Sequence, residues 1–144
     1  MICIIKLRVR YAETDKMGVV YHTRYFEWFE MGRTELIRIS GLSYKYLEEN
    51  NISLPVVEMK ANYYKPALYD DIITIETWME QTPSARVKIE YKAKRDEEIL
   101  AIGYTLHTFI DKNFKIIKPP RDLIDKLRRL KELPGFQNIN YIGE

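Results

Sequence analysis

A helical pattern between Tyr25 and Ile39 constrains the fold of this chain more than any other part of the sequence. Apolar side chains recur there at steps of three and four residues, which is the spacing of one helical face. The face consists of Tyr25, Phe29, Gly32, Leu36 and Ile39, and Phe26, Trp28 and Ile37 widen it. Because so broad an apolar face must be covered, we expect a mostly buried helix that starts after the N-cap Thr23 and ends near Ser40 and Gly41.

The cover for this helix is predicted by alternating apolar and polar residues elsewhere in the chain. A period of two is typical of half-buried strands. It marks four segments, at residues 3–11, 54–64, 73–79 and 87–93, and a fifth segment, at residues 99–110, is apolar on both faces, as expected for a strand covered on both sides. The last four follow one another on short turns, which favours antiparallel pairing. The sequence therefore predicts an α+β fold in which a five-stranded antiparallel sheet wraps around one long helix. Gly32 costs about 1 kcal/mol relative to alanine inside a helix, so we expect the sheet or a second subunit to pack closely there.

Two further helices complete the predicted elements. Ser43 is suited to cap a short helix that follows the long one. The pair Pro119-Pro120 starts a C-terminal helix over about residues 120–131, with a short tail after residue 134. At 144 residues the chain fits one domain, which we place at residues 1–144.

Composition excludes several classes of protein. Lys and Arg number 23 against 21 Asp and Glu, so the net charge of +2 gives no general reason to expect nucleic acid as a partner. The single cysteine, Cys3, lies in an apolar strand-like run and is predicted to pack in the core. The first residues lack the pattern of a signal peptide, and no stretch approaches the roughly 20 apolar residues of a membrane span. The cytoplasm is therefore the expected compartment.

The loop before the long helix carries the candidate chemistry. Alternation in the first strand places Tyr11 on the inward side, so we expect its hydroxyl to point into the protein, within reach of Asp15. Gly18 permits a close approach of the backbone to a ligand. A carboxylate at Asp15 could deprotonate water or attack a carbonyl, while N–H groups at the helix start near His22 and Thr23 stabilise the developing oxyanion. A solvated turn is the alternative interpretation of an isolated aspartate.

The two histidines differ in their sequence context. His22 could act as a general acid or base, or orient a carbonyl or a water molecule. His107 shares one face of an apolar strand with Thr105 and Phe109, which favours a core or interface histidine. Neither histidine stands at metal-ligand spacing with Asp15 or with each other, so we expect no metal site. The sequence also lacks a phosphate-binding glycine loop, a dinucleotide fingerprint and a nucleophile elbow.

One face of the strand around residues 87–93 is basic. Its cations are Arg86, Lys88, Lys92 and Lys94. Such a face is most often solvated. The rival interpretation is a site for phosphates, either of nucleic acid or of a phosphate-bearing molecule such as coenzyme A.

Two spaced motifs carry a resemblance to a known family. The first reads Tyr11-x-x-Thr14-Asp15-x-x-Gly18-Val19-Val20-Tyr21-His22-x-x-Tyr25-x-x-Trp28-x-Glu30-x-x-Arg33. The second reads Tyr64-Lys65-Pro66-Ala67-x-x-x-Asp71. In these motifs and in the order of its elements, over about residues 7–130, the chain resembles the hotdog-fold acyl-CoA thioesterases of the 4-hydroxybenzoyl-CoA thioesterase and YbgC type. The Tyr21-His22 pair places it nearer the YbgC type.

The resemblance implies a fold, an activity and an assembly. The fold is the hotdog fold, and the activity is hydrolysis of an acyl-CoA or acyl carrier protein thioester to a carboxylic acid and a thiol, with no cofactor because coenzyme A is part of the substrate. The family forms homodimers that join their sheets, and these commonly pair into homotetramers. The implied catalytic residues are Asp15, Tyr11 and His22, and the implied substrate-binding residues are Gly18, Val20 and Tyr25.

Three other functions are weighed against hydrolysis. A non-catalytic hotdog protein would bind an acyl-CoA or acyl carrier protein thioester without consuming it, and the presence of Tyr11, Asp15 and His22 together argues against this. A nucleic-acid-binding module would depend on the basic strand face alone. A hotdog dehydratase would need a helix-borne acid and histidine pair, which is not evident. Short aliphatic, long aliphatic and aryl thioesters are all compatible with the sequence.

Overall fold

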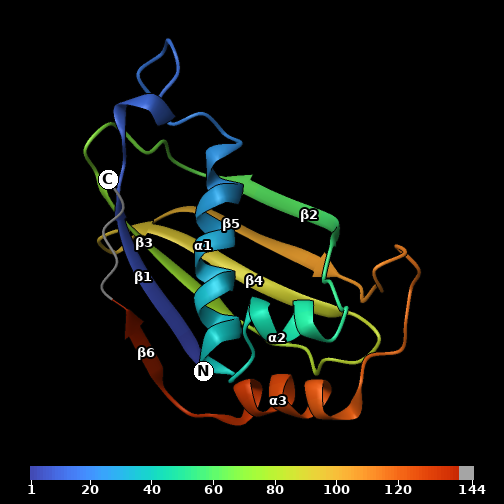
Figure 1. The fold of residues 1–144 in the computed structure, drawn as a ribbon. Helices are drawn as coiled ribbons and strands as arrows, with labels where there is room; N and C mark the ends of the chain where they lie inside the picture. Colours follow the sequence, from blue (N-terminus) through green and yellow to red (C-terminus); the bar gives the residue numbers. More distant parts are fainter. Residues whose placement is uncertain (140–144) are drawn as a thin grey trace.

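The computed structural model describes residues 1–139. The elements in chain order are β1 (Ile2–Arg8), the 3-10 turn η1 (Tyr11–Glu13), α1 (Arg24–Ile39), α2 (Tyr44–Glu49), β2 (Val56–Tyr63), β3 (Ile72–Trp78), β4 (Val87–Arg95), β5 (Glu98–His107), α3 (Arg121–Glu132) and β6 (Phe136–Ile139). Figure 1 shows α1 crossing one face of the sheet, with the loop that precedes it at one end of the molecule and α2 and α3 towards the other.

The strands form one sheet in the order β2-β5-β4-β3-β1-β6. The first five pair with their neighbours in antiparallel fashion, which confirms the predicted five-stranded antiparallel sheet. The strand β6 then adds a sixth member that runs parallel to β1. It forms in the tail after residue 134, where the sequence shows little periodicity. The rest of that predicted tail, residues 140–144, lies outside the described residues.

Helix α1 packs against the sheet through its predicted apolar face. Its buried residues are Tyr25, Trp28, Phe29, Gly32, Leu36 and Ile37. A Cβ atom at Gly32 would clash with the hydroxyl of Thr77 on β3, so the close partner there is the sheet of the same chain. Thr23 occupies the N-cap position, although its side chain makes no capping hydrogen bond. The helix ends at the predicted place, with Ser40 as C-cap and Gly41 at φ +87°.

The two smaller helices also match their predictions. In α2, the hydroxyl oxygen of Ser43 accepts a hydrogen bond of 3.0 Å from the backbone N–H of Tyr46. In α3, one face is buried through Leu123, Leu127 and Leu130. None of the helices within residues 1–139 is long and apolar enough to cross a membrane.

The prediction that the Tyr11 side chain points into the protein is wrong. Cys3, Ile5, Leu7 and Val9 are buried as the alternation requires, but Tyr11 is 78% exposed. The strand β1 ends at Arg8, and the turn η1 then changes the direction of the chain, so the alternation no longer decides which side a residue faces. The ring of Tyr11 meets the ring of Tyr69 edge to face, with centroids 5.7 Å apart, on the surface of the molecule.

Candidate active site

Asp15 lies in a small hairpin formed by residues 13–21, which we call the Asp15 hairpin. The two arms are joined where the backbone N–H of Asp15 donates to the carbonyl of Val19 at 2.8 Å and the N–H of Tyr21 donates to the carbonyl of Glu13 at 2.9 Å. Gly18 adopts φ +81° at the tip, a conformation that glycine takes without strain. The second arm runs directly into α1, so the hairpin brings Asp15 back beside the start of that helix.

The Asp15 carboxylate is half-buried and uses one oxygen to stabilise its own turn. Its Oδ1 atom accepts a hydrogen bond of 2.8 Å from the backbone N–H of Met17. From residues 1–139 its Oδ2 atom accepts no hydrogen bond. One oxygen thus fixes the orientation of the group, and the other is available to a ligand.

The start of α1 offers backbone donors. Within the described part of the chain, the N–H groups of His22 and Thr23 donate to no acceptor, as expected for groups at a helix N-terminus. The position of this start is fixed from the sheet, because the hydroxyl of Tyr63 at the end of β2 donates to the carbonyl of His22 at 2.7 Å. Tyr63 also packs edge to face on Tyr25, with ring centroids 5.1 Å apart.

A hollow of about 410 Å³ joins the carboxylate and the helix start. It is lined by Asp15, Met17, Val19, Val20, His22, Tyr25, Tyr63, Tyr64, Lys65 and Pro66. Four predicted site residues, Asp15, His22, Val20 and Tyr25, are therefore brought together. Gly18 and Tyr11 are not among the lining residues: Gly18 shapes the tip of the hairpin and Tyr11 lies on the surface.

Burial raises the pKa of both Tyr25 and Tyr63, so their hydroxyls stay protonated at neutral pH.

Two supporting residues were not predicted from the sequence. Glu13 is buried at 3% exposure, and its Oε2 atom accepts a hydrogen bond of 2.8 Å from the indole N–H of Trp28 on α1. For Tyr63 the sequence predicts only a place within a strand, in the segment 54–64. Both contacts join residues at least 15 positions apart, so no local pattern could have revealed them. The one available signal for Glu13 is its position: it is an acidic residue that lies two positions before Asp15, within the first motif.

The second motif lies beside the Asp15 hairpin and lines the hollow through Tyr64, Lys65 and Pro66. The backbone N–H of Val20 donates to the carbonyl of Ala67 at 2.9 Å, and Val19 forms a β-bridge with Leu68.

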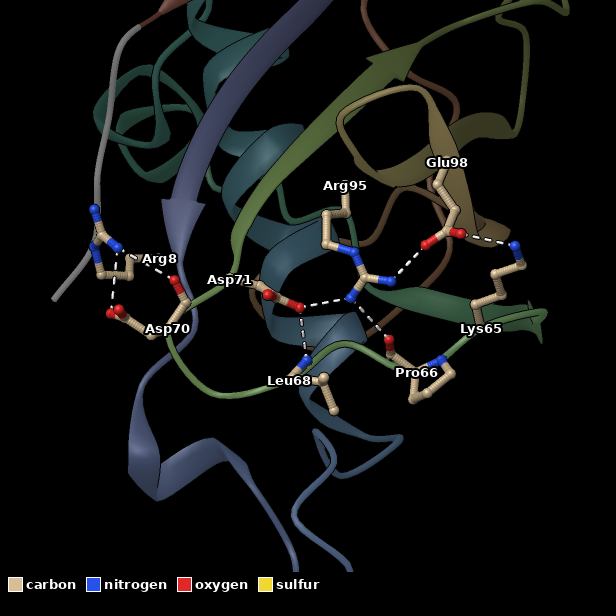
Figure 2. A network of polar contacts seen from close by, with 8 residues as sticks. All are labelled: Arg8, Lys65, Pro66, Leu68, Asp70, Asp71, Arg95 and Glu98. Carbon is tan, nitrogen blue, oxygen red and sulfur yellow. Dashed lines mark hydrogen bonds and ion pairs between the residues drawn. The ribbon is translucent and has the colours of Figure 1, made fainter.

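Figure 2 shows how the turn formed by this motif is held in place. The Asp71 carboxylate accepts hydrogen bonds from the N–H of Leu68 at 2.9 Å and from the guanidinium of Arg95 at 2.7 Å. Further hydrogen bonds join Arg95 to the carbonyl of Pro66 and to Glu98, and Lys65 to Glu98.

His107 and Cys3 lie away from the hollow, as predicted for core residues. His107 is 1% exposed, and its ring nitrogens face the carbonyl of Leu54 at 3.0 Å and the hydroxyl of Thr105 at 2.8 Å. Desolvation, with a contribution from Arg33, lowers the pKa of His107 to about 4. Burial raises the pKa of the Cys3 thiol to about 12, so this cysteine is a packing residue and not a nucleophile.

Two of the four cations on the basic strand face, Lys88 and Lys94, have acidic partners. Lys94 forms an ion pair of 3.2 Å with Glu76, and Lys88 lies 3.9 Å from Glu90 and over the ring of Tyr104. These paired cations offer little to the phosphates of nucleic acid, whereas Lys92 lies over the ring of Trp78. Among residues 1–139 no cluster of three histidine, cysteine or acidic side chains has the geometry to hold a metal ion.

Comparisons with known proteins agree with this arrangement. A family model described as the thioesterase-like superfamily matches residues 9–134. YneP of Bacillus subtilis (strain 168), provisionally named an acyl-CoA thioesterase, is 37% identical over 115 residues, which are 78% of this chain and 83% of YneP. The acyl-CoA thioesterase YbgC of Haemophilus influenzae is 33% identical over 96 residues, which are 66% of this chain and 71% of that protein.

A solved structure extends the likeness to the whole fold. The DHNA-CoA thioesterase from Staphylococcus aureus superposes with a TM-score of 0.83 at 32% identity, covering 96% of this chain and 98% of that one. The fold is therefore the hotdog fold, and the chain belongs to the thioesterase-like superfamily. The resemblance to acyl-CoA thioesterases of the 4-hydroxybenzoyl-CoA thioesterase and YbgC type is confirmed.

Proposed function

We propose that this protein hydrolyses acyl-CoA thioesters to a carboxylic acid and free coenzyme A. The observation that carries the proposal is a single hollow lined both by Asp15 and by His22, at the start of α1, where backbone N–H groups are open. A hydrolase needs both parts, because one group must supply or activate the nucleophile and another must stabilise the negative charge on the carbonyl oxygen. The names of YneP and YbgC support the same class of reaction.

The proposed reaction runs by one of two routes. In the first, Asp15 takes a proton from water, the hydroxide adds to the thioester carbon, and the carbon–sulfur bond breaks as the thiolate leaves and is protonated. In the second, an Asp15 oxygen attacks the carbon and expels the thiolate, which gives a mixed anhydride that water then hydrolyses. In both routes the N–H groups of His22 and Thr23 stabilise the oxyanion. Water is the only co-substrate that either route requires.

The other residues of the predicted site are considered for supporting roles in this proposal. The His22 imidazole lies at the helix start, where it can orient the carbonyl or the attacking water. The side chains of Val20 and Tyr25 contact the acyl group, and Gly18 keeps the tip of the hairpin free of a side chain. Tyr11, which the resemblance places beside Asp15, is 78% exposed and does not line the hollow, so we assign it no step in either route.

Replacement of Asp15 by Asn tests the proposal directly. Asn retains an oxygen to accept from the Met17 N–H but cannot act as a base or nucleophile, so we expect thiol release from acyl-CoA to fall by about 10²- to 10⁴-fold. Asp70→Asn is the matched control, because Asp70 is exposed, pairs with Arg8 and lies outside the hollow. A parent-like rate in Asp15→Asn would show that Asp15 is not the reacting group. No thiol release by the parent protein, despite binding of acyl-CoA, would favour a non-catalytic binding protein.

Isotope labelling separates the two routes. In a single turnover in H₂¹⁸O, the anhydride route can transfer label into the Asp15 carboxylate, whereas the general-base route places it only in the released acid. Mass spectrometry of the peptide that contains Asp15 measures the difference. A panel of aliphatic and aryl acyl-CoA and acyl carrier protein thioesters would then define the preferred substrate.

We also propose that the protein is a homodimer or homotetramer in which the β2 edges of two copies pair. The strand β2 is a free edge of the sheet, and Val56, Val57, Met59 and Tyr63 on it are 40%, 49%, 52% and 43% exposed. Long apolar edges of this kind are normally covered in native proteins. A Met59→Lys variant should shift the mass measured by light scattering towards the monomer, and a monomeric parent protein would exclude this assembly. The cytoplasm stays the predicted compartment.

A further inference from the structure

A buried carboxylate that the proposed reaction does not use lies two residues before Asp15. Glu13 is 3% exposed, although its neighbours Tyr11 and Ala12 are on the surface. A carboxylate loses its hydration when it is buried, so it must be compensated by hydrogen bonds. Both oxygens of Glu13 have such partners: Oε1 accepts from the backbone N–H of Arg10 at 2.8 Å, and Oε2 accepts from the indole N–H of Trp28 at 2.8 Å.

These contacts close a ring that contains both halves of the proposed active site. The carbonyl of Glu13 accepts from the N–H of Tyr21, which holds together the arms of the Asp15 hairpin. The second arm continues through His22 into α1, and Trp28 lies one turn further along that helix, where it is 2% exposed. The Trp28 indole then returns to the Glu13 carboxylate. Because the ring is closed, this hydrogen bond restrains the hairpin relative to the helix start.

We propose that Glu13 is a positioning residue, whose carboxylate holds the Asp15 hairpin on Trp28 and thereby fixes the Asp15 carboxylate relative to the open N–H groups of α1. This inference rests on the proposed function, since it takes Asp15 as the reacting group. Glu13 does not line the hollow and has no contact with substrate in it. Its effect is therefore on the geometry of the transition state and not on the affinity for substrate.

The first test is the kinetics of Glu13→Gln with the acyl-CoA that the parent protein hydrolyses best. Oε1 of Glu13 faces two donors of Arg10, the backbone N–H at 2.8 Å and Nε at 3.5 Å, so the amide oxygen should take that side. The NH₂ group is then turned towards the Trp28 N–H, and the hydrogen bond to Trp28 is lost. We expect kcat to fall by about 10- to 100-fold with KM changed less than about threefold, because a displacement of about 1 Å costs that much in rate. Arg8→Gln is the control, since it removes an exposed ion pair with Asp70 at the same end of the sheet.

The second test is Trp28→Phe, alone and combined with Glu13→Gln. Phenylalanine retains an aromatic ring against Tyr25 but has no N–H, so it removes the same hydrogen bond from the other side. If the two residues act as one anchor, the double variant should have a kcat close to that of the slower single variant. A product of the two separate losses in the double variant would show that the residues act independently and would overturn the proposal.

Asp15→Asn in the same assay distinguishes failure of this inference from failure of the proposed function. If Asp15→Asn is inactive while folded Glu13→Gln keeps kcat within about twofold of the parent, the inference is wrong and the proposed function stands. If Asp15→Asn is as active as the parent, both are wrong. A loss of kcat that only follows the folded fraction, measured by circular dichroism at the assay temperature, would assign Glu13 to stability alone. The same conclusion would follow if both Glu13→Gln and Trp28→Phe failed to fold.

Discussion

Two polar networks support the same sheet, one exposed to water and one in the core. The exposed network consists of Lys65, Glu98, Arg95 and Asp71, and it holds the turn that forms one wall of the hollow (Figure 2). The buried network is a chain of hydrogen bonds that runs from Arg33 on α1 through Tyr91 on β4 to Thr105 and His107 on β5. Both join residues from neighbouring elements, but Tyr91, Thr105 and His107 are buried, whereas every side chain of the first network is at least 21% exposed. The comparison shows how the surroundings of a hydrogen bond decide which condition can break it.

The buried chain has a single consistent direction. The carbonyl of Leu54 can only accept, so the proton of the neutral His107 ring is on Nδ1 and its Nε2 atom accepts from the hydroxyl of Thr105 at 2.8 Å. Thr105 in turn accepts from the hydroxyl of Tyr91 at 2.6 Å, and Tyr91 accepts from the Arg33 guanidinium at 3.2 Å. A second proton on His107 would face the Thr105 hydroxyl donor. The chain is therefore satisfied only while His107 is neutral.

The exposed network depends on charge and not on the placement of one proton. Lys65 and Arg95 lower the pKa of Glu98, so its carboxylate is ionised at neutral pH. Side chains in this network are 21–56% exposed, and ions in solution screen the attraction between them. We therefore expect acid to weaken the buried chain first, and salt to weaken the exposed network alone.

Acidification should produce the largest effect. The pKa of His107 is about 4 in the folded protein and about 6.5 when the chain is unfolded, so the unfolded state binds more protons between these values. The stabilisation that neutral His107 provides is complete above about pH 6.5 and is lost as the pH falls through about 4. From the size of this shift, the free energy of unfolding should fall by about 3 kcal/mol over that range, measured by urea denaturation.

The His107→Gln variant isolates this contribution. It should be less stable than the parent at pH 7, and its stability should change less between pH 6.5 and 4, because the titrating group is absent. Carboxylates also titrate near the lower limit, so the difference between the two slopes is the quantity to compare. Equal slopes in the parent and the variant would mean that His107 does not titrate with a lowered pKa.

Removal of one hydroxyl from the buried chain should have an intermediate effect. Tyr91→Phe keeps the ring that stacks on Phe29, with centroids 4.6 Å apart, and removes only the oxygen. Arg33 then loses an acceptor and Thr105 loses a donor, which should lower the free energy of unfolding by about 1.5 kcal/mol. Thermal and urea unfolding would measure this loss. A value below about 0.3 kcal/mol would mean that water replaces the hydroxyl and that the chain is not sealed from solvent.

A distinction between local and distant contacts explains how much of the molecule the sequence predicts. The apolar face of α1, the cap at Ser43 and the turn at Gly41 depend on residues within a few positions, and each is found where predicted. The buried, hydrogen-bonded His107 is also as predicted, since the strand around it is apolar. Local periodicity is a good guide wherever one regular element continues.

The features that the sequence did not predict correctly lie where a regular element ends or where residues distant in sequence meet. Tyr11 was assigned by extending the period of β1 past the point where the strand ends at Arg8. The burial of Glu13 depends on Trp28, and the strand β6 depends on pairing with β1 at the other end of the chain. Asp15, His22, Val20 and Tyr25 were placed together because the motif carries them over a short stretch, whereas Tyr63 comes to the helix start from β2, about 40 residues away in sequence.

Removal of charge from the exposed network should have the smallest effect on stability and the clearest dependence on salt. Arg95→Met leaves Asp71 with its bond to the Leu68 N–H, so we expect a loss of no more than about 1 kcal/mol. Raising NaCl from about 0.05 M to about 0.5 M should reduce the difference in free energy of unfolding between Arg95→Met and the parent. Salt screens the charge attraction that only the parent has. The difference in free energy of unfolding between Tyr91→Phe and the parent should stay the same, since the Tyr91 hydroxyl is buried and carries no charge for salt to screen. If both differences narrowed equally, the two networks would be equally open to solvent and the comparison would not hold.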